Sequence, residues 1–235
     1  MKLFGKKADP VIGLDIGSTS VRLLQLSSHG SGYRIDHFAI EPIVEGVVVD
    51  KAVQDVEAAA NAISKAVRVS GTRAKSCAIA VSGSAVFTKT ISLPADLADA
   101  DIESQVQIEA NQYIPYPLDE VSLDFEVLGP SARNADLMDI LLAASKSEIV
   151  ESRQDAIDTA DLKAKVVDVE AFAIANAFEL IRKRDGVNRN DAVGFFDIGY
   201  DMTTLLVIRV AGLSIHVIIL LVVTSYWKKP SAAMT

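Results

Sequence analysis

Two segments at opposite ends of the chain share one pattern: an apolar run, an Asp-x-Gly turn and a second apolar run, with no helical stretch between the runs. The first is VIGLDIGSTSVRLLQL, residues 11–26, and the second is VGFFDIGYDMTTLLVI, residues 193–208. Apolar runs on both sides of a glycine turn are typical of two strands joined in a hairpin. The sequence therefore predicts two β-hairpins, each with a carboxylate just before its tip.

The N-terminal part of the chain predicts three strands, a helix and a further strand. The strands are expected over 11–17, 20–28 and 33–40, the helix over 50–71 and the last strand over 75–83. The helix is expected because apolar residues recur at helical spacing from Val53 to Val67, and Gly71 ends it. This order predicts an antiparallel meander that opens a βββαβ unit.

Residues 84–162 have a different order, which predicts a small inserted α+β subdomain. The expected elements are a strand over 86–94, a helix over 96–114, strands over 121–129 and 137–146, and a helix over 147–161. Asp96 is the expected N-cap of the first helix, and Pro115 is expected to end it. A strand over 164–170 and a helix from Ala171 then return to the first pattern.

The most apolar segment, residues 205–223, predicts a pair of strands. Arg209 and His216 interrupt it, and the uninterrupted part is too short to cross a bilayer as a helix. No apolar run follows the basic residues at the N-terminus, so no secretory signal is expected and the chain is predicted to begin in the cytoplasm.

Composition excludes several classes of function. The chain has 235 residues and a formal net charge of -8, with no basic stripe, so nucleic acid is not an expected ligand. The single cysteine, Cys77, rules out an internal disulfide framework and fits a reducing compartment. His29, His37 and His216 lack the spacing of metal ligands.

The two Asp-x-Gly tips are suited to holding a phosphate chain. A glycine turn leaves backbone N–H groups free and lets them approach phosphate closely, and nearby hydroxyl groups add donors. A carboxylate beside phosphate would be repelled unless Mg²⁺ or its water shell lay between the two charges. Asp15 and Asp197 are therefore the expected Mg²⁺ partners.

Three stretches carry a resemblance to a known family. They are GKKADPVIGLDIGSTSVRLLQLS at residues 5–27, IEANQYIPYPLDEVSLDFEVL at 108–128 and VVDVEAFAIANAFEL at 166–180. Together they resemble the PilM family, actin-like cytoplasmic components of type IV pilus assembly. The resemblance extends to about Ile208, and YIPYPLDEV, residues 113–121, is its most discriminating part.

The resemblance implies an α/β, actin-like ATPase (ribonuclease H-like) fold related to that of the division protein FtsA. Residues 1–83 and 163–188 would form subdomain 1A, and 84–162 an inserted 1C subdomain of the SHS2 type. Residues 189–235 would begin the second half of the fold, which stays incomplete.

The resemblance also implies residue roles and an ATP cofactor with Mg²⁺. The first phosphate loop would comprise Asp15, Gly17, Ser18 and Thr19, and the second Asp197, Gly199, Thr203 and Thr204. Glu170 stands where relatives direct a water towards the nucleotide, and an acid that caps the following helix is the alternative. Asp15 and Asp197 would hold Mg²⁺ through bound water.

The implied partner is PilN, an inner-membrane protein whose short cytoplasmic tail binds in a groove beside 1C. Tyr113 and Tyr116 are the expected contact residues. The protein would then be a scaffold for pilus assembly and twitching motility, held at the inner membrane only through its partner. Its ATPase activity would be weak at most, and self-association stays open. An FtsA-like filament protein and a sugar kinase-type phosphotransferase are the alternatives.

The segment after Arg209 departs from the family, which continues with a Gly-Gly turn and an amphipathic helix. A shift of the reading frame by one base, with a suitable choice of wobble bases, converts residues 214–235 into such a turn and helix. A frameshift or truncation near Arg209 is therefore the hypothesis for this tail, and weaker nucleotide binding would be its consequence.

Overall fold

The computed structural model describes residues 9–220 except 31, 50, 187, 189–190, 201–202 and 210–213. The strands are β1 (Val11–Ile16), β2 (Ser20–His29), β3 (Gly32–Pro42), β4 (Val48–Val49), β5 (Ala52–Val53), β6 (Ser76–Val81), β7 (Val86–Pro94), β8 (Val121–Pro130), β9 (Leu137–Lys146), β10 (Lys163–Val169), β11 (Ala192–Ile198), β12 (Thr203–Arg209) and β13 (Ser214–Leu220). The α-helices are α1 (Val56–Ser70), α2 (Asp99–Tyr113), α3 (Ser147–Thr159) and α4 (Glu170–Asp185).

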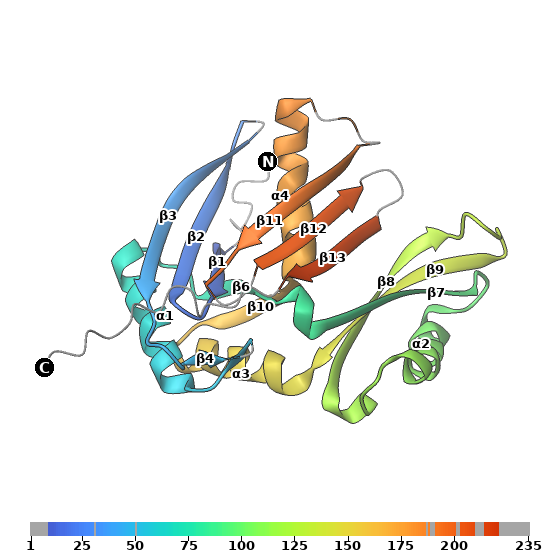
Figure 1. Ribbon diagram of the computed structural model, residues 1–235, viewed down its shortest axis with the longest axis horizontal. Coiled ribbons are helices and arrows are strands. Elements are labelled where there is room, and N and C mark those ends of the chain that lie inside the picture. Colours follow the sequence, from blue (N-terminus) through green and yellow to red (C-terminus); the bar gives the residue numbers. More distant parts are fainter. Residues whose placement is uncertain are drawn as a thin grey trace, which may run out of the picture.

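A five-stranded sheet in the order β10-β6-β1-β2-β3 forms the body of the molecule (Figure 1). Strands β1, β2 and β3 pair antiparallel, whereas β6 lies parallel to β1 and β10 lies parallel to β6. Strands β6 and β10 each come directly after a helix, because two parallel strands must be joined by a crossover connection, which is usually helical. The predicted meander and βββαβ unit are confirmed.

Helices α1 and α3 cover one face of this sheet and bury its apolar residues in a first core. The side chains of Ile12, Val21, Ile63 and Cys77 are fully buried there. Asp55 caps α1 by accepting from the amide of Ala58, and Gly71 ends the helix in the left-handed conformation. The helix starts later than predicted, because Val48–Val49 pairs with Ala52–Val53 in the short β4–β5 hairpin.

The opposite face of the sheet is also apolar, although no described helix covers most of it. Leu24 pairs with Phe38 across β2 and β3, and Leu26 pairs with Ile35 beyond a bulge at Gln25. The bulge keeps these pairs on one side of the sheet, because without the extra residue the next pair would face the other way. Leu24, Leu26, Ile35 and Phe38 are all exposed.

The inserted subdomain is a three-stranded sheet in the order β7-β9-β8, packed against α2 at the right of Figure 1. Its core joins strand residues such as Ile140 and Leu142 to Ile102, Val106 and Ala110 of α2. The prediction of Asp96 as the N-cap is wrong, since Ala98 occupies that position and no side chain caps the helix. Leu97 packs against the inserted core, so tertiary packing sets the start of the helix.

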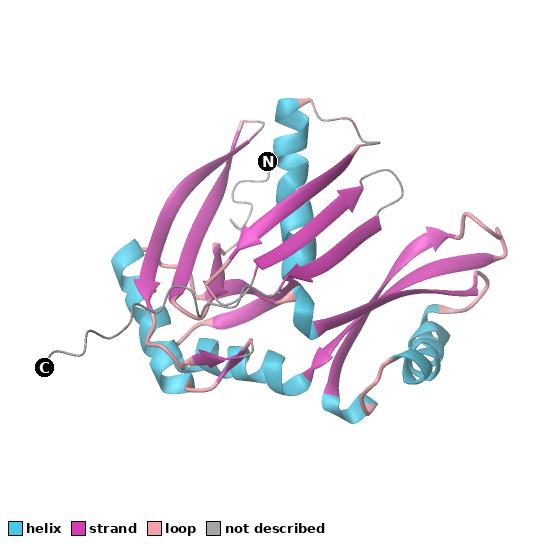
Figure 2. Ribbon diagram, in the orientation of Figure 1, coloured by secondary structure: helices cyan, strands magenta, loops and turns pink. Residues whose placement is uncertain are grey.

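Helix α3 joins the inserted sheet to the first core. It begins directly after β9, as Figure 2 shows, and it packs along α1, with Ala156 and Ile157 fully buried in the first core. The predicted boundary of the inserted unit at residue 162 therefore lies beyond a helix that packs mainly against α1, β5 and β10. By packing, the inserted unit ends near Lys146.

A second three-stranded sheet, β11-β12-β13, packs beside α4. Phe178 of α4 meets Phe195 of β11 edge to face at 5.0 Å. Strands β12 and β13 pair antiparallel from Arg209↔Ser214 to Thr203↔Leu220, so the predicted strand pair is confirmed. None of the helices in the described part of the chain is long and apolar enough to cross a bilayer.

Candidate functional site

The first Asp-x-Gly tip closes the hairpin between β1 and β2. The amide of Gly17 donates to the carbonyl of Ser20 at 3.0 Å, and a Cβ added to Gly17 would lie 3.3 Å from that oxygen. This close approach favours glycine. The carbonyl of Thr19 accepts from the amide of Ile43, which ties the tip to the end of β3. Ser18, between them, is half-buried.

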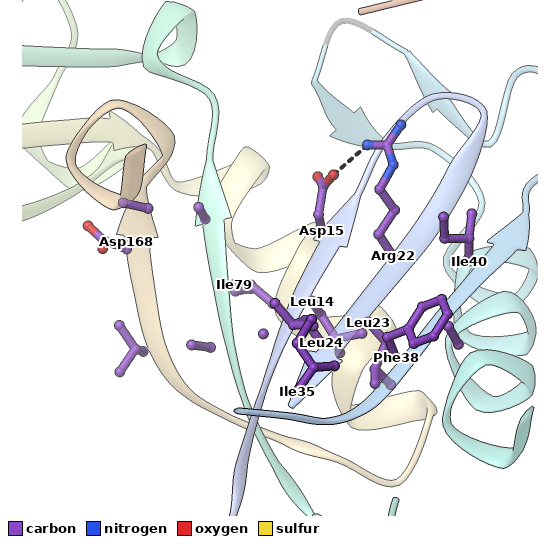
Figure 3. Close-up of a pocket in the computed structure, with 16 residues that line it drawn as sticks. Leu14, Asp15, Arg22, Leu23, Leu24, Ile35, Phe38, Ile40, Ile79 and Asp168 are labelled. Atoms are coloured by element: carbon purple, nitrogen blue, oxygen red, sulfur yellow. Dashed lines mark hydrogen bonds and ion pairs between the residues drawn. The ribbon is translucent and has the colours of Figure 1, made fainter. Parts of the chain in front are cut away.

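Asp15 pairs across this hairpin with Arg22. Nη1 of Arg22 lies 2.6 Å from Oδ2 of Asp15, and the two residues are direct partners in the β1–β2 register (Figure 3). Both side chains are about half exposed, 54% for Asp15 and 55% for Arg22. The carboxylate is thus held at the mouth of the tip while it remains accessible to solvent.

A polar group lies behind the tip, where β1, β6 and β10 end. Glu170 opens α4, and burial raises the pKa of its carboxyl, while Lys51, a hydrogen bond with Ser82 and the charge of Arg153 act in the opposite direction. The charge of Asp15 adds to the increase in that pKa. The structure therefore brings two of the predicted residues, Asp15 and Glu170, into one electrostatic group.

Arg153 of α3 is the most buried charged member of this group, with 3% of its surface exposed. Its Nη1 donates to the carbonyl of Ile16 at 3.2 Å, and its Nη2 donates to the carbonyl of Lys51 at 3.1 Å. Burial lowers the pKa of the Arg153 guanidinium, while Glu170 and Asp15 oppose that change. The guanidinium of Arg153 thus binds the backbone at the base of the first tip and interacts electrostatically with Glu170.

Glu170 is not a helix cap. Val169 occupies the N-cap position of α4, and no side chain caps that helix. The carboxyl of Glu170 instead interacts with Ser82, Lys51 and Arg153. Of the two alternatives that the sequence left open, capping does not fit this placement, and a role in directing a water stays a prediction.

Sequence reasoning missed Arg22, Lys51, Ser82 and Arg153. Arg153 carried a detectable pattern, because it occupies the buried stripe of α3 with Ile149, Ala156 and Ile157, where helical spacing predicts an apolar residue. Arg22 could have been found from the hairpin register opposite Asp15. Lys51 and Ser82 had no local pattern, since only the packing of distant elements places them here.

The second tip lies between β11 and β12. Asp197 pairs with Thr204 across the hairpin, and Ile198 pairs with Thr203. Asp197 and Gly199 are exposed, Thr204 is half-buried and Thr203 is buried. Among the described residues, no hydrogen bond or ion pair joins Asp197 to Asp15, Arg153 or Glu170. Within the described residues, the polar group formed by Arg153, Lys51, Ser82 and Glu170 lies behind the first tip.

The donor groups at the first tip fit hydrated Mg²⁺ delivered with phosphate. In the described part of the chain, no three His, Cys, Asp or Glu side chains come together as a metal cage. Mg²⁺ commonly keeps several waters and binds through one or two carboxylates and the substrate phosphates. The accessible carboxylate of Asp15 meets that requirement, with Arg22 beside it as a competing cation.

A cavity of about 600 Å³ lies against the uncovered face of the five-stranded sheet (Figure 3). Leu24, Ile35 and Phe38 line it, and Asp15 and Asp168 stand at its polar end. Apart from Arg22, no cation of the described residues lines this space, and its walls are apolar. The cavity is therefore unsuited to a phosphate chain, and the polar group behind the tip is the better candidate.

Tyr113 and Tyr116, the predicted partner-binding residues, lie at the end of α2 and in the loop that follows. Each ring is partly exposed and lies beneath a lysine: Lys89 is 4.8 Å from the Tyr113 centroid, and Lys146 is 5.0 Å from the Tyr116 centroid. Cation–π contacts at exposed sites such as these are worth about 0.5–1 kcal/mol. The inserted subdomain thus presents two partly exposed aromatic rings.

Comparison with known proteins defines the class of the fold and then the family. The chain superposes on a chain of a PilM-PilN type IV pilus biogenesis complex with a TM-score of 0.74 and 28% identity, covering 88% of this chain and 60% of that one. It also superposes on the cytoplasmic domain of EpsL, an inner-membrane component of the Vibrio cholerae type II secretion system, with a TM-score of 0.54, 11% identity and coverage of 89% and 71%. The fold is the predicted actin-like ATPase fold.

The family follows from the sequence match. Residues 13–215 match the family described as type IV pilus assembly protein PilM. The chain therefore belongs to the PilM family, and the predicted resemblance is confirmed. The match continues into β13, beyond the predicted end near Ile208. The chain spans only 60% of the length of the related chain in the PilM-PilN complex.

Proposed function

We propose that this protein is a scaffold of type IV pilus assembly that binds the cytoplasmic tail of a PilN-like inner-membrane protein. The observation that carries the proposal is the superposition on the PilM-PilN complex at a TM-score of 0.74 across 88% of the chain. Docking to such a tail would hold the protein at the cytoplasmic face of the inner membrane through its partner. The inserted subdomain, with Tyr113 and Tyr116, is the proposed docking region.

We further propose that the first tip binds Mg-ATP as a structural or switching ligand. The Gly17 turn, the accessible carboxylate of Asp15 and the cationic groups of Arg153 and Lys51 support this assignment. Mg²⁺ would supply charge neutralisation between Asp15 and the phosphates. Asp197, Gly199, Thr203 and Thr204 would contribute from the second tip.

The residues of the first tip have separate roles in this proposal. Gly17 allows the main chain to approach the phosphates, and Ser18 and Thr19 offer hydroxyl donors. Asp15 binds the water shell of the cation. Glu170, whose carboxyl pKa is raised by burial, can form a hydrogen bond with a water next to the phosphates.

Co-purification from membranes tests the scaffold proposal. The tagged chain is expressed with the PilN-like protein encoded in the same genome, and the membranes are solubilised in detergent and passed over the affinity resin. The PilN-like protein should be retained, and a version without its N-terminal cytoplasmic residues should not. Equal recovery of both versions, or of neither, would contradict docking through that tail.

A further inference from the structure

Arg153 is a buried charge that forms no ion pair within the described residues. Its side chain is 3% exposed, two of its nitrogens donate to main-chain carbonyls, and Nε has no hydrogen-bond partner in the described part of the chain. A guanidinium stays charged in proteins, and burying it without a carboxylate partner is unfavourable. An apolar residue at this position of α3 would give a better core, so stability alone does not account for Arg153.

The two carbonyls that Arg153 binds belong to special positions of the backbone. Ile16 ends β1 directly before Gly17, so its peptide group sets the direction in which the first tip leaves the sheet. Lys51, in the β4–β5 turn, has a φ of 73°, a conformation that residues other than glycine rarely adopt. Arg153 thus holds the base of the tip and a strained turn at the same time.

A second contact of α3 fixes the same turn. Oγ of Ser152 accepts from the amide of Val53 at 3.3 Å, one residue along the helix from Arg153. Two neighbouring residues of α3 therefore hold the backbone that runs from Lys51 to Val53, and the Lys51 side chain lies within electrostatic range of Glu170. The β4–β5 turn thus places Lys51 close to the polar group behind the tip. Nothing in the local sequence requires a lysine at this position.

Helix α3 also connects these contacts to the inserted sheet. The helix starts at Ser147, immediately after the central strand β9 of the inserted sheet ends at Lys146. A rigid helix that is continuous with that strand carries Arg153 into the base of the tip. A change in the position of the inserted sheet would reach the tip through this helix.

We propose that Arg153 is the positioning residue of the first tip, which fixes the main chain at Ile16 and Lys51 so that the tip and the Lys51 amine meet a bound phosphate. The inference rests on the proposed binding of Mg-ATP, which it deepens by naming the residue that shapes the site. Arg153 itself acts through the backbone of its neighbours. Through α3, a movement of the inserted sheet would be transmitted to the tip and so to a bound nucleotide.

The test compares Arg153→Met and Arg153→Lys with Ile157→Val, a control on the same helix that perturbs the core without touching the tip. Mg-ATP affinity is measured by fluorescence titration at a temperature where every variant is folded, and amide hydrogen exchange is followed by mass spectrometry. Arg153→Met should weaken Mg-ATP binding at least tenfold and speed exchange at residues 16–19 and 51–53. Arg153→Lys should lose less affinity, since it keeps the charge and one donor contact.

The control and the two readouts separate the outcomes. Ile157→Val should lower the melting temperature and leave both Mg-ATP affinity and exchange at residues 17–19 and 51–53 unchanged. Wild-type affinity and unchanged exchange in Arg153→Met would overturn the inference, and Arg153→Lys decides it in the same way if Arg153→Met does not fold. If the unaltered protein does not bind Mg-ATP, the proposed nucleotide function fails, and exchange at residues 16–19 still reports whether Arg153 shapes the tip.

Discussion

Nη1 of Arg153 donates a hydrogen bond of 3.2 Å to the carbonyl of Ile16, although the two residues are 137 positions apart in the chain. The contact joins the helix that follows the inserted sheet to the first Asp-x-Gly tip. The tip is therefore not a free hairpin end, because its base is fixed by an element from another part of the fold. The proposed ligand binding at this tip therefore depends on the packing of α3 as well as on the residues of the tip itself.

Asp15→Asn should weaken Mg-ATP binding at least tenfold with little effect on stability. The substitution removes the charge that would hold the water shell of Mg²⁺, whereas the exposed Asp15–Arg22 pair is worth only about 0–1 kcal/mol. Calorimetric titration with Mg-ATP and a thermal melt measure the two effects. Arg22→Gln is the matched control, since it breaks the same pair and leaves the carboxylate. Equal losses of affinity in the two variants would assign the effect to the pair and not to the cation.

Glu170→Gln should raise the melting temperature at pH 7 and leave it nearly unchanged at pH 4. Burial raises the pKa of Glu170 in the folded state, so the folded protein binds more protons than the unfolded chain between the ordinary glutamate pKa and the raised one. Stability contributed by this group is then lost as the pH rises through that window. The glutamine variant has no such loss.

Thermal melts of both proteins from pH 4 to pH 8 test this prediction. An increase of a few degrees at pH 7 corresponds to about 1 kcal/mol in a domain of this size. A lower melting temperature for Glu170→Gln at pH 7 would mean that attraction to Arg153 and Lys51 outweighs burial.

Ile157→Ala should destabilise the first core and not the inserted sheet. The side chain is fully buried among residues of α1 and the five-stranded sheet, so its truncation should cost about 2–5 kcal/mol. Hydrogen exchange should accelerate in β1 and α1 while β7 and β8 keep their protection. Leu142→Ala, buried in the inserted core, should show the reverse distribution. Faster exchange in the inserted sheet of Ile157→Ala would restore the sequence-based boundary at residue 162.

Tyr116→Ala and Tyr113→Ala should each weaken binding of a PilN-type peptide about tenfold or more. Both rings are partly exposed, and tyrosine is among the residues that most often dominate binding energy at interfaces. Phenylalanine at either position keeps the ring and should bind within about threefold of wild type, a difference of less than 1 kcal/mol. Unchanged affinity in both alanine variants, with wild-type melting curves, would place the docking region elsewhere.

Much of the fold follows from local sequence patterns. Alternating positions around Gly17 and helical spacing before Gly71 were sufficient for the meander and α1, because both patterns are created by neighbouring residues. The strand pair β12–β13 was likewise predictable, since Arg209 and His216 divide an otherwise apolar run. The inserted α+β subdomain followed from the order of elements over residues 84–162, and the family resemblance added the actin-like fold.

The remaining features depend on contacts between distant residues. The apolar stripe of α3 would fit either sheet, so the sequence could not assign the helix to the first core. Asp96 has the chemistry of an N-cap, but Leu97 packs into the inserted core and the helix starts later. Asp15 and Glu170 were predicted from the sequence, whereas Arg153, on a stripe where an apolar residue is expected, carried a pattern that could have been read and was not.

Direct titration of this protein with a PilN-type tail tests the central claim. A synthetic peptide covering the N-terminal cytoplasmic residues of the PilN-like protein from the same genome is titrated by isothermal calorimetry, with a scrambled peptide of the same composition as control. The account predicts saturable one-to-one binding, with Kd of about 1–100 μM, equivalent to roughly 5–8 kcal/mol, and none for the scrambled peptide. Absence of saturable heat at millimolar peptide, with the protein demonstrably folded, would contradict it.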